Sequence, residues 1–201
     1  MNTFGGRAAG PLPAGFRYSL EAAAQTGHVG DAVHRASAWF SYLARTVSWR
    51  WPVDLSVEYK YASGTEDSNP GRVSTFDQMY PASHDKFGHA DLFGWRNIHN
   101  VRSLETIRFT KTTALNLMYN SHWLASPRDA LYNGQGRQIA RAPNGDAGRY
   151  VGQEFDVYGT RQWGPFRFGA GFAHFFAGEF LRNTTPHVNP RYLYVFQSYA
   201  F

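Results

Sequence analysis

The sequence contains no cysteine, little charge and no long apolar run, and each absence excludes a class of protein. Without cysteine there is no disulfide, no thiol nucleophile and no thiolate metal site. No stretch approaches the roughly 18 consecutive apolar residues of a membrane-spanning helix. Charged residues are only 17% of the 201-residue chain and the basic ones stand singly, which disfavours a nucleic-acid partner. A chain of this length suits a single domain with a substantial core.

The N-terminus also lacks the pattern of a secretory signal peptide. Residues 1–16 read MNTFGGRAAGPLPAGF and contain no apolar core of the ~7–15 residues found in a secretory signal peptide. A protein bound for the bacterial outer membrane needs such a signal for export. We therefore expect either a soluble protein or a chain with residues missing upstream.

Aromatic residues and glycine, by contrast, are abundant. Aromatics make up 17% of the chain, and 20 residues are glycine. Together with the lack of long apolar runs, this composition is typical of a membrane β-barrel, in which lipid-facing and lumen-facing residues alternate. A soluble β-sandwich or a lectin-like jelly roll is the alternative. The net charge of +5 and the pI near 9.6 indicate an anionic partner.

The C-terminal residues, reading RYLYVFQSYAF, favour the barrel. Counted back by twos from Phe201, every residue to Leu193 is apolar or aromatic except Gln197, which predicts a strand with one apolar face. Outer-membrane barrels often end on such an aromatic strand, whereas loose termini of soluble domains are usually polar. A buried C-terminal strand of a soluble protein has the same alternation.

Alternation of apolar and polar residues predicts nine strands in all. They are Thr3–Ala8, Phe16–Gln25, Val33–Val47, Val53–Tyr61, Ile98–Phe109, Ala114–Leu124, Arg149–Arg161, Phe166–Phe176 and Arg191–Phe201. On the seventh strand we expect Val151 to share a face with Phe155 and Val157. On the fifth, Glu105 falls on the otherwise apolar face, where contact with lipid would be costly.

The predicted connections are sorted by length. Long polar loops (63–97, 125–148 and 178–190) alternate with short turns on the side where the C-terminus lies, and a medium loop spans 26–31. Outer-membrane barrels have short periplasmic turns and long external loops. Aromatic residues cluster at both ends, as interfacial girdles do. The short-turn end has Trp49, Trp51, Phe109, Trp163 and Phe166, and the long-loop end has Tyr61, Trp95 and Trp123. We therefore predict an all-β fold, an antiparallel up-and-down transmembrane β-barrel.

Several stretches form a recognisable set of motifs. They are YASG at 61–64, TFDQMYP at 75–81, SHDKFGHADLFGWRN at 83–97, NIHNVR at 97–102, SHWLASPRDALYN at 121–133, VGQEFDVYGT at 151–160 and HFFAGEFL at 174–181. Together they resemble the alginate-export family of outer-membrane porins. The resemblance implies a monomeric 18-stranded barrel that passively exports a uronate polysaccharide such as alginate through a narrow basic pore. Because single-chain bacterial barrels have even strand numbers, nine strands suggest that residues 1–201 are the C-terminal half of such a barrel domain.

Charged residues on the polar faces of the strands are the candidate site. Arginine holds a carboxylate in two parallel hydrogen bonds, so basic residues around a narrow lumen select for anions. The basic candidates for polyanion contact are Arg7, Arg17, Lys60, Arg102, Arg108 and Arg167. The acidic candidates, expected to hold these side chains in place, are Glu21, Asp54, Glu58, Glu154 and Asp156. Alternatively, the two sets only neutralise each other in a wet lumen.

Signals for catalysis or metal binding are weak. The histidines His84, His89 and His99 with Asp85 and Asp91 fit no metal-ligand spacing, and Glu66, Asp67 and Asn69 are better explained by a turn than by Ca²⁺. No GxSxG elbow accompanies Ser121 and His122. Glu154 and Asp156 have the residue types of a glycosidase pair, but ion pairing is preferred. We predict no enzyme, no metal and no cofactor, with an acidic-glycan-binding or glycan-hydrolysing protein, soluble or barrel-borne, as the alternative.

Overall fold

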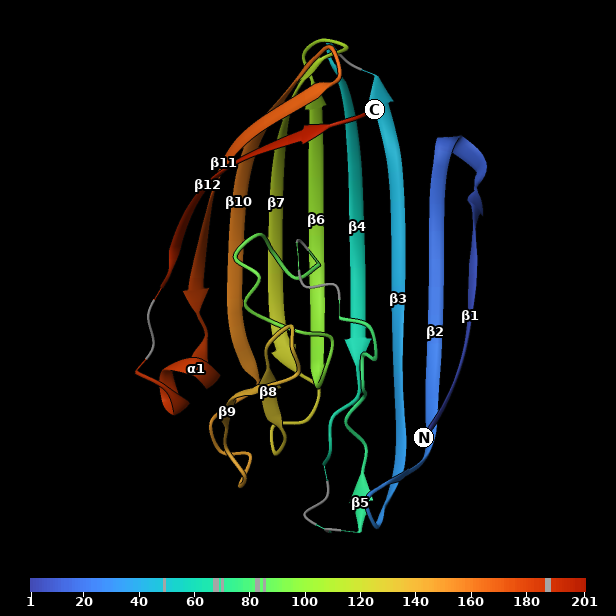
Figure 1. Cartoon of the computed structure of the whole chain (residues 1–201), viewed down its shortest axis with the longest axis vertical. Coiled ribbons are helices and arrows are strands. Elements are labelled where there is room, and N and C mark those ends of the chain that lie inside the picture. Colours follow the sequence, from blue (N-terminus) through green and yellow to red (C-terminus); the bar gives the residue numbers. More distant parts are fainter. Residues whose placement is uncertain (49, 67–68, 70, 82–83, 85, 187–188) are drawn as a thin grey trace.

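The chain forms a long antiparallel sheet with very little helix (Figure 1). A computed structural model describes residues 1–48, 50–66, 69, 71–81, 84, 86–186 and 189–201. Nine strands follow one another in an up-and-down meander, each antiparallel to the next. They are β1 (Asn2–Pro11), β2 (Phe16–Val29), β3 (Ala32–Ser48), β4 (Pro52–Ala62), β6 (Ile98–Arg108), β7 (Thr113–Leu124), β10 (Tyr150–Trp163), β11 (Phe166–Ala177) and β12 (Arg191–Tyr199).

The connections contain smaller elements that the sequence patterns did not predict. β5 (Arg72–Val73) pairs parallel to β3, and β8 (Ala130–Tyr132) forms a hairpin with β9 (Gln138–Arg141). A short helix, α1 (Glu179–Thr184), precedes β12, and a 3-10 turn, η1 (Pro13–Gly15), joins β1 to β2. Among the described residues, no helix has the length and apolar content needed to cross a membrane.

Each of the nine predicted segments contains a strand, which confirms the antiparallel all-β fold. The medium loop predicted at 26–31 is wrong, because β2 and β3 continue to the pair Val29↔Ala32. Only Gly30 and Asp31 remain as a turn, and Gly30 has the positive φ of 58° that two-residue hairpin turns require. This connection is therefore short, although it lies at the long-loop end.

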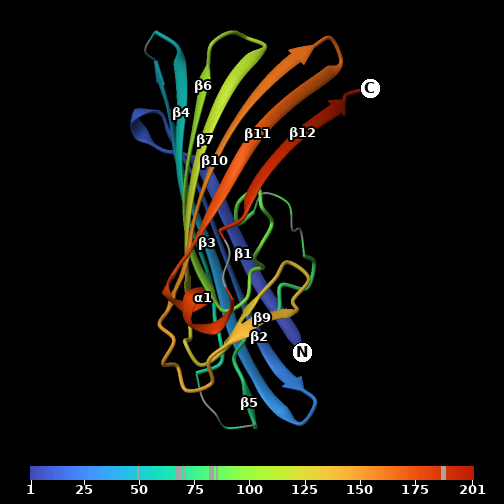
Figure 2. The same cartoon turned by 90° about the vertical axis from the view of Figure 1, so that its left-hand side faces the viewer.

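The sheet does not close on itself. In the part of the chain that the structure describes, β1 and β12 are the two edges and do not pair with each other. The nine main strands lie side by side in this sheet. Figure 2 shows that the sheet is bent and twisted, with residues 63–97 on one side of it. The described residues thus form an open antiparallel sheet of nine main strands and not a closed barrel.

Strand register divides the sheet into two faces. Directly paired residues share a face, so the row Tyr18–Leu43–Val57 belongs to one face and the row Glu21–Phe40–Lys60 to the other. We call the first the apolar face; its exposed residues include Leu20, Leu43, Val57, Val101, Leu117, Phe155, Phe172 and Val195. We call the second the polar face. By register, all the predicted charged candidates lie on the polar face.

The hydrophobic core lies between the polar face and the long connections that fold over it. Loop residues Phe76, Phe87 and Phe93 pack there, with Leu131 of β8 and Phe180 of α1. The sheet contributes Ile98, Leu124, Val151 and Phe175 at its long-loop end. Residues 63–97, expected as an external loop, thus return over the sheet (Figure 2).

Val151 is buried in this core, against the prediction that it shares a face with Phe155. The register shifts between Tyr150 and Gly152, where Gly152 has a φ of 146°. Such a bulge adds one residue to a strand and turns the side chains before it to the opposite face.

The aromatic residues at the strand ends partly match the predicted girdles. At the short-turn end the rings of Trp51 and Phe109 meet edge to face at 5.0 Å, and at the long-loop end Trp39 stacks on Tyr61 at 4.0 Å. Trp95 departs from the prediction. Its Nε1 donates to the Tyr61 carbonyl at 2.9 Å from a loop that covers the polar face. Trp49 lies outside the described residues.

Candidate functional site

A buried ion-pair cluster lies at the middle of the polar face. Lys60 Nζ is 2.5 Å from Glu58 Oε2, and Arg102 Nη2 is 2.6 Å from Glu58 Oε1. The three side chains are only 8–13% exposed. Register places Glu58 opposite Arg102 and Lys60 opposite Asn100, so strand pairing alone brings these groups together. Glu58 thus shares its buried carboxylate between two cations.

A second pair lies toward the short-turn end. Arg108 donates from Nε at 3.1 Å and from Nη2 at 2.5 Å to Asp54 Oδ2, while Thr46 Oγ1 donates to Asp54 Oδ1 at 2.6 Å. Arg17 Nη1 in turn donates to Thr46 Oγ1 at 3.4 Å. Arg108 is half exposed, so this pair is in contact with solvent and contributes little to stability.

Arg167 lies in a polar hollow of about 380 Å³ at the same end of the sheet. The hollow is lined by Arg108, Thr110, Lys111, Thr112, Thr113, Ala114, Thr160, Gln162 and Arg167. Its lining carries three cations and no carboxylate. This basic hollow lies at the end of the sheet where the predicted periplasmic turns lie.

Glu154 and Asp156 hold a loop rather than an arginine. Ala90 N–H donates to Glu154 Oε1 at 3.0 Å, and His89 N–H donates to Asp156 Oδ1 at 3.4 Å. The loop comes so close at Gly88 that a Cβ there would lie 2.3 Å from Glu154 Oε1. Gly88 also has a φ of 112°, so both space and backbone require glycine.

Aromatic contacts fix the same part of the loop. The His89 ring stacks on Tyr194 at 5.0 Å and meets Tyr158 edge-on at 4.8 Å. Phe93 packs edge-on against His122 at 4.9 Å and against Phe175 at 5.4 Å. With the two backbone hydrogen bonds, these contacts seat residues 87–93 on the polar face over β7, β10, β11 and β12.

The N-terminal part of the loop is tied to β2. Gln25 Nε2 donates to the Asp77 carbonyl at 2.6 Å, and Asp77 N–H donates to Gln25 Oε1 at 2.8 Å. Arg96 lies 2.7 Å from the Asp77 carboxylate. Burial works to raise the pKa of Asp77, but the Met79 N–H and the Arg96 guanidinium outweigh it and hold that pKa below its usual value.

The two long loops are also tied to each other through Asp129. Its Oδ2 accepts from Thr65 N–H at 2.9 Å and from Thr75 Oγ1 at 2.5 Å, and its Oδ1 accepts from Tyr132 at 2.9 Å. Burial and the neighbouring carboxylate raise the pKa of the Tyr132 phenol, which therefore stays a donor. The loop covering the polar face is thus anchored at three places: at Thr65 and Thr75 by Asp129, at Asp77 by Gln25, and at residues 87–93 by the sheet.

Between this loop and the sheet lies a groove of about 580 Å³. We call it the loop groove; it is lined by Arg7, Glu21, Phe40, Lys60, Gln78, Tyr80, Lys86, Phe87 and Trp95. Arg7 is held by Ser19 Oγ, to which its Nε donates at 3.3 Å. The Nζ of Lys60 lies 5.8 Å from the Phe40 ring and 5.5 Å from the Phe87 ring. Basic groups and aromatic rings therefore share one cavity.

The five loop residues of this groove were missed from the sequence because the loop was expected outside the sheet. The available signal was the density of aromatic residues in a segment otherwise rich in glycine and proline. Phe40 was recognisable, since it shares a strand face with Tyr42 and is register-paired with Lys60.

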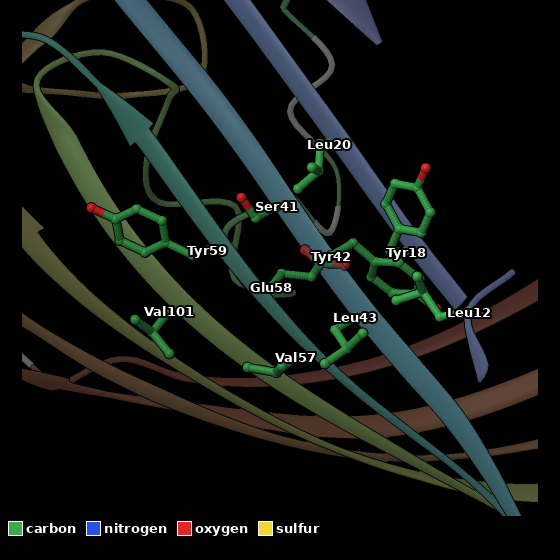
Figure 3. A pocket seen from close by; sticks show the side chains of 10 residues that line it. All are labelled: Leu12, Tyr18, Leu20, Ser41, Tyr42, Leu43, Val57, Glu58, Tyr59 and Val101. Atoms are coloured by element: carbon green, nitrogen blue, oxygen red, sulfur yellow. The ribbon is translucent and has the colours of Figure 1, made fainter. Parts of the chain in front are cut away.

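A hollow of about 490 Å³ on the other side of the sheet has a different character (Figure 3). Leu20, Leu43, Val57 and Val101 line it from neighbouring strands β2, β3, β4 and β6. These side chains belong to the apolar face, and an almost wholly apolar surface offers nothing to orient a charged ligand. We assign it to the outer surface of the sheet and not to the site.

The histidine-rich segment does not form a metal site in the described part of the chain. There, no three or more of His, Cys, Asp and Glu gather at metal-binding distance. His84 Nδ1 pairs with Asp91 Oδ2 at 2.8 Å, while His99 lies on the apolar face and bonds the Tyr59 hydroxyl at 2.6 Å. Asp67 and Asp85 lie outside the described residues.

The fold and site define an all-β sheet protein with an apolar outer face and a charged inner face covered by its own loop. A family model described as alginate export matches residues 1–195, and the chain belongs to the alginate export family, a family of outer-membrane transport porins. No curated protein matches the chain.

Proposed function

We propose that this chain is part of an outer-membrane channel for passive export of an anionic polysaccharide such as alginate. The observation that carries the proposal is the sorting of charge: every candidate charged residue lies on the polar face of the sheet. Family membership supports the polysaccharide as cargo. The apolar face then contacts outer-membrane lipid.

We further propose that residues 1–201 are the C-terminal half of a monomeric 18-stranded barrel domain. Open strand edges leave backbone N–H and C=O groups unpaired, which in lipid costs several kcal/mol for each group. β1 and β12 are such edges in the described sheet. Further strands of the same barrel, from an N-terminal half, would pair with both of them.

On this proposal the channel catalyses no reaction during transport. Guanidinium and ammonium groups bind uronate carboxylates, and binding must remain weak enough for a polymer to move on. Glu58 limits the attraction, because it neutralises part of the charge of Lys60 and Arg102. No cofactor and no catalytic step is involved. The glycosidase alternative is disfavoured, since loop backbone at His89 and Ala90 fills the space in front of Glu154 and Asp156.

Single-channel recording of the full-length protein in planar bilayers tests the proposal. We expect anion selectivity and concentration-dependent block by polyuronate added on the short-turn side. A neutral glucan of the same length is the control and should block much less. Cation selectivity, or conductance unaffected by polyuronate, would contradict the proposal.

A further inference from the structure

We propose that the loop groove is a subsite for one uronate residue, which binds through both its carboxylate and the apolar face of its pyranose ring. This deepens the proposed function and depends on it, because the ligand is the transported polymer. The new element is that recognition combines charge with ring stacking at one place, and that a loop supplies half of it.

Charge in the loop groove favours a carboxylate. Three of its lining residues are basic, Arg7, Lys60 and Lys86, against one acidic residue, Glu21. Lys60 is buried, whereas Arg7 and Lys86 are the exposed basic groups of the lining. One comes from strand β1 and the other from the loop, so a carboxylate between them contacts both walls of the groove.

Aromatic rings supply the second part of the subsite. Phe40, Tyr80, Phe87 and Trp95 make up four of the nine lining residues. The electron-rich face of an aromatic ring attracts positively polarised C–H groups, and one face of a pyranose ring presents such groups. Phe87 is buried beneath Lys60, whereas Tyr80 is 85% exposed and can accept a sugar ring without rearrangement of the core.

The loop geometry holds Tyr80 at the groove. Gln78 Oε1 accepts from Trp95 N–H at 2.7 Å, and Met79, just before Tyr80, has a positive φ of 52°. The Met79 N–H donates to Asp77 Oδ1 at 3.1 Å, and Asp77 is itself held by Gln25 and Arg96. Met79 is left-handed, and the residues before it, Asp77 and Gln78, are held by hydrogen bonds. The chain therefore turns sharply at Met79, and Tyr80 follows directly on this ordered turn.

This arrangement discriminates between polyanions. A polypeptide polyanion such as polyglutamate offers carboxylates but no pyranose ring, and a neutral glucan offers rings but no charge. A uronate polymer offers both a carboxylate for Arg7 and Lys86 and a pyranose ring for Tyr80. The loop groove thus selects acidic sugars over other polymers of equal charge.

Block of single channels by oligouronate and by polyglutamate of equal charge tests the subsite with Tyr80→Ser. We expect affinity for oligouronate to fall about tenfold, equivalent to about 1.4 kcal/mol, while block by polyglutamate changes less than about twofold. Lys86→Gln should weaken block by both polymers. Tyr192→Ser is the matched control, because Tyr192 is an exposed tyrosine of the polar face outside the loop groove, and it should leave both affinities unchanged.

The outcomes separate the subsite from the channel. If oligouronate blocks the wild type but Tyr80→Ser binds it equally well, or Tyr192→Ser loses as much affinity, the subsite is wrong and the channel stands. If Tyr80→Ser weakens block by oligouronate and by polyglutamate equally, the proposed stacking of the sugar ring on Tyr80 is also wrong. If neither polymer blocks the wild type, the proposed function itself is overturned.

Discussion

The two faces of the sheet invert the arrangement of a soluble protein. On the apolar face, Val57 is 46% exposed and Phe155 49%. On the polar face, one position away along the same strands, Glu58 is 7% exposed and Glu154 is fully buried. A soluble sheet buries its apolar face and leaves charge in water. Here the charge is enclosed and the hydrophobic surface is open.

This difference is what the proposed lipid contact of the apolar face would require. Monomeric soluble proteins rarely expose apolar patches larger than a few hundred Å². The exposed apolar residues of this sheet run across eight neighbouring strands, from Leu20 on β2 to Val195 on β12. On the polar face, two cations pair with the buried Glu58, and loop backbone donates to one carboxyl oxygen of the buried Glu154. Variants that exchange the properties of the faces test this distinction.

The largest effect is expected for Glu58→Gln. It leaves Lys60 and Arg102 buried with no shared counter-ion, and removing one partner of a buried pair costs about 3–5 kcal/mol. The free energy of unfolding in detergent or lipid, measured by urea titration, gives the value. Lys60→Met in the same background should restore part of the loss. A loss below about 1 kcal/mol would mean that this part of the face is solvated.

A charge on the apolar face should cost nearly as much. Val57→Arg places a cation at the middle of β4, where the proposed lipid contact would make it unfavourable by about 2–4 kcal/mol. The matched control is Ser56→Arg, one residue away on the polar face. Outer-membrane insertion, followed by fractionation and heat-dependent gel mobility, should fall for Val57→Arg only. Equal behaviour of the two variants contradicts a difference in medium.

Gly88→Ala should unseat the loop from the polar face without changing the sheet. A Cβ there meets Glu154, and alanine at a φ of 112° adds strain of about 1–3 kcal/mol. We expect a higher single-channel conductance and faster proteolysis within residues 63–97. Gly164→Ala is the control, because Gly164 also has a positive φ, 56°, but nothing lies within 4 Å of its Cβ position. Unchanged conductance in Gly88→Ala would show that the loop does not narrow the passage.

The smallest effect is expected at Glu105. Register pairs it with Leu55 and Leu117 on the apolar face, where an acidic side chain opposes lipid contact. Glu105→Leu should stabilise the protein in lipid by up to about 1 kcal/mol. Glu21→Leu, on the polar face, should not stabilise it. A destabilising Glu105→Leu would show that this carboxylate has a favourable partner.

Much of the sheet was predictable because its evidence is periodic. Alternation identified the strands and placed Glu58, Lys60 and Arg102 on one face, and strand pairing then brought them into contact. The inward course of residues 63–97 was not predictable, since it depends on contacts far apart in sequence, such as Ala90 with Glu154. The bulge at Gly152 was also not predicted. One inserted residue reverses the alternation of faces along the strand, and the residue types around it give no sign of the insertion.

The directions of the two edge strands carry a consequence for assembly. Eight antiparallel steps separate β1 from β12 along the nine-strand path, so both edges run the same way, from the long-loop end to the short-turn end. A second copy of this sheet in the same orientation would meet both edges as parallel pairs. Antiparallel seams instead require a complement whose first and last strands both run in the opposite direction. A complement that made antiparallel seams with both edges would therefore differ from this sheet in the directions of its edge strands.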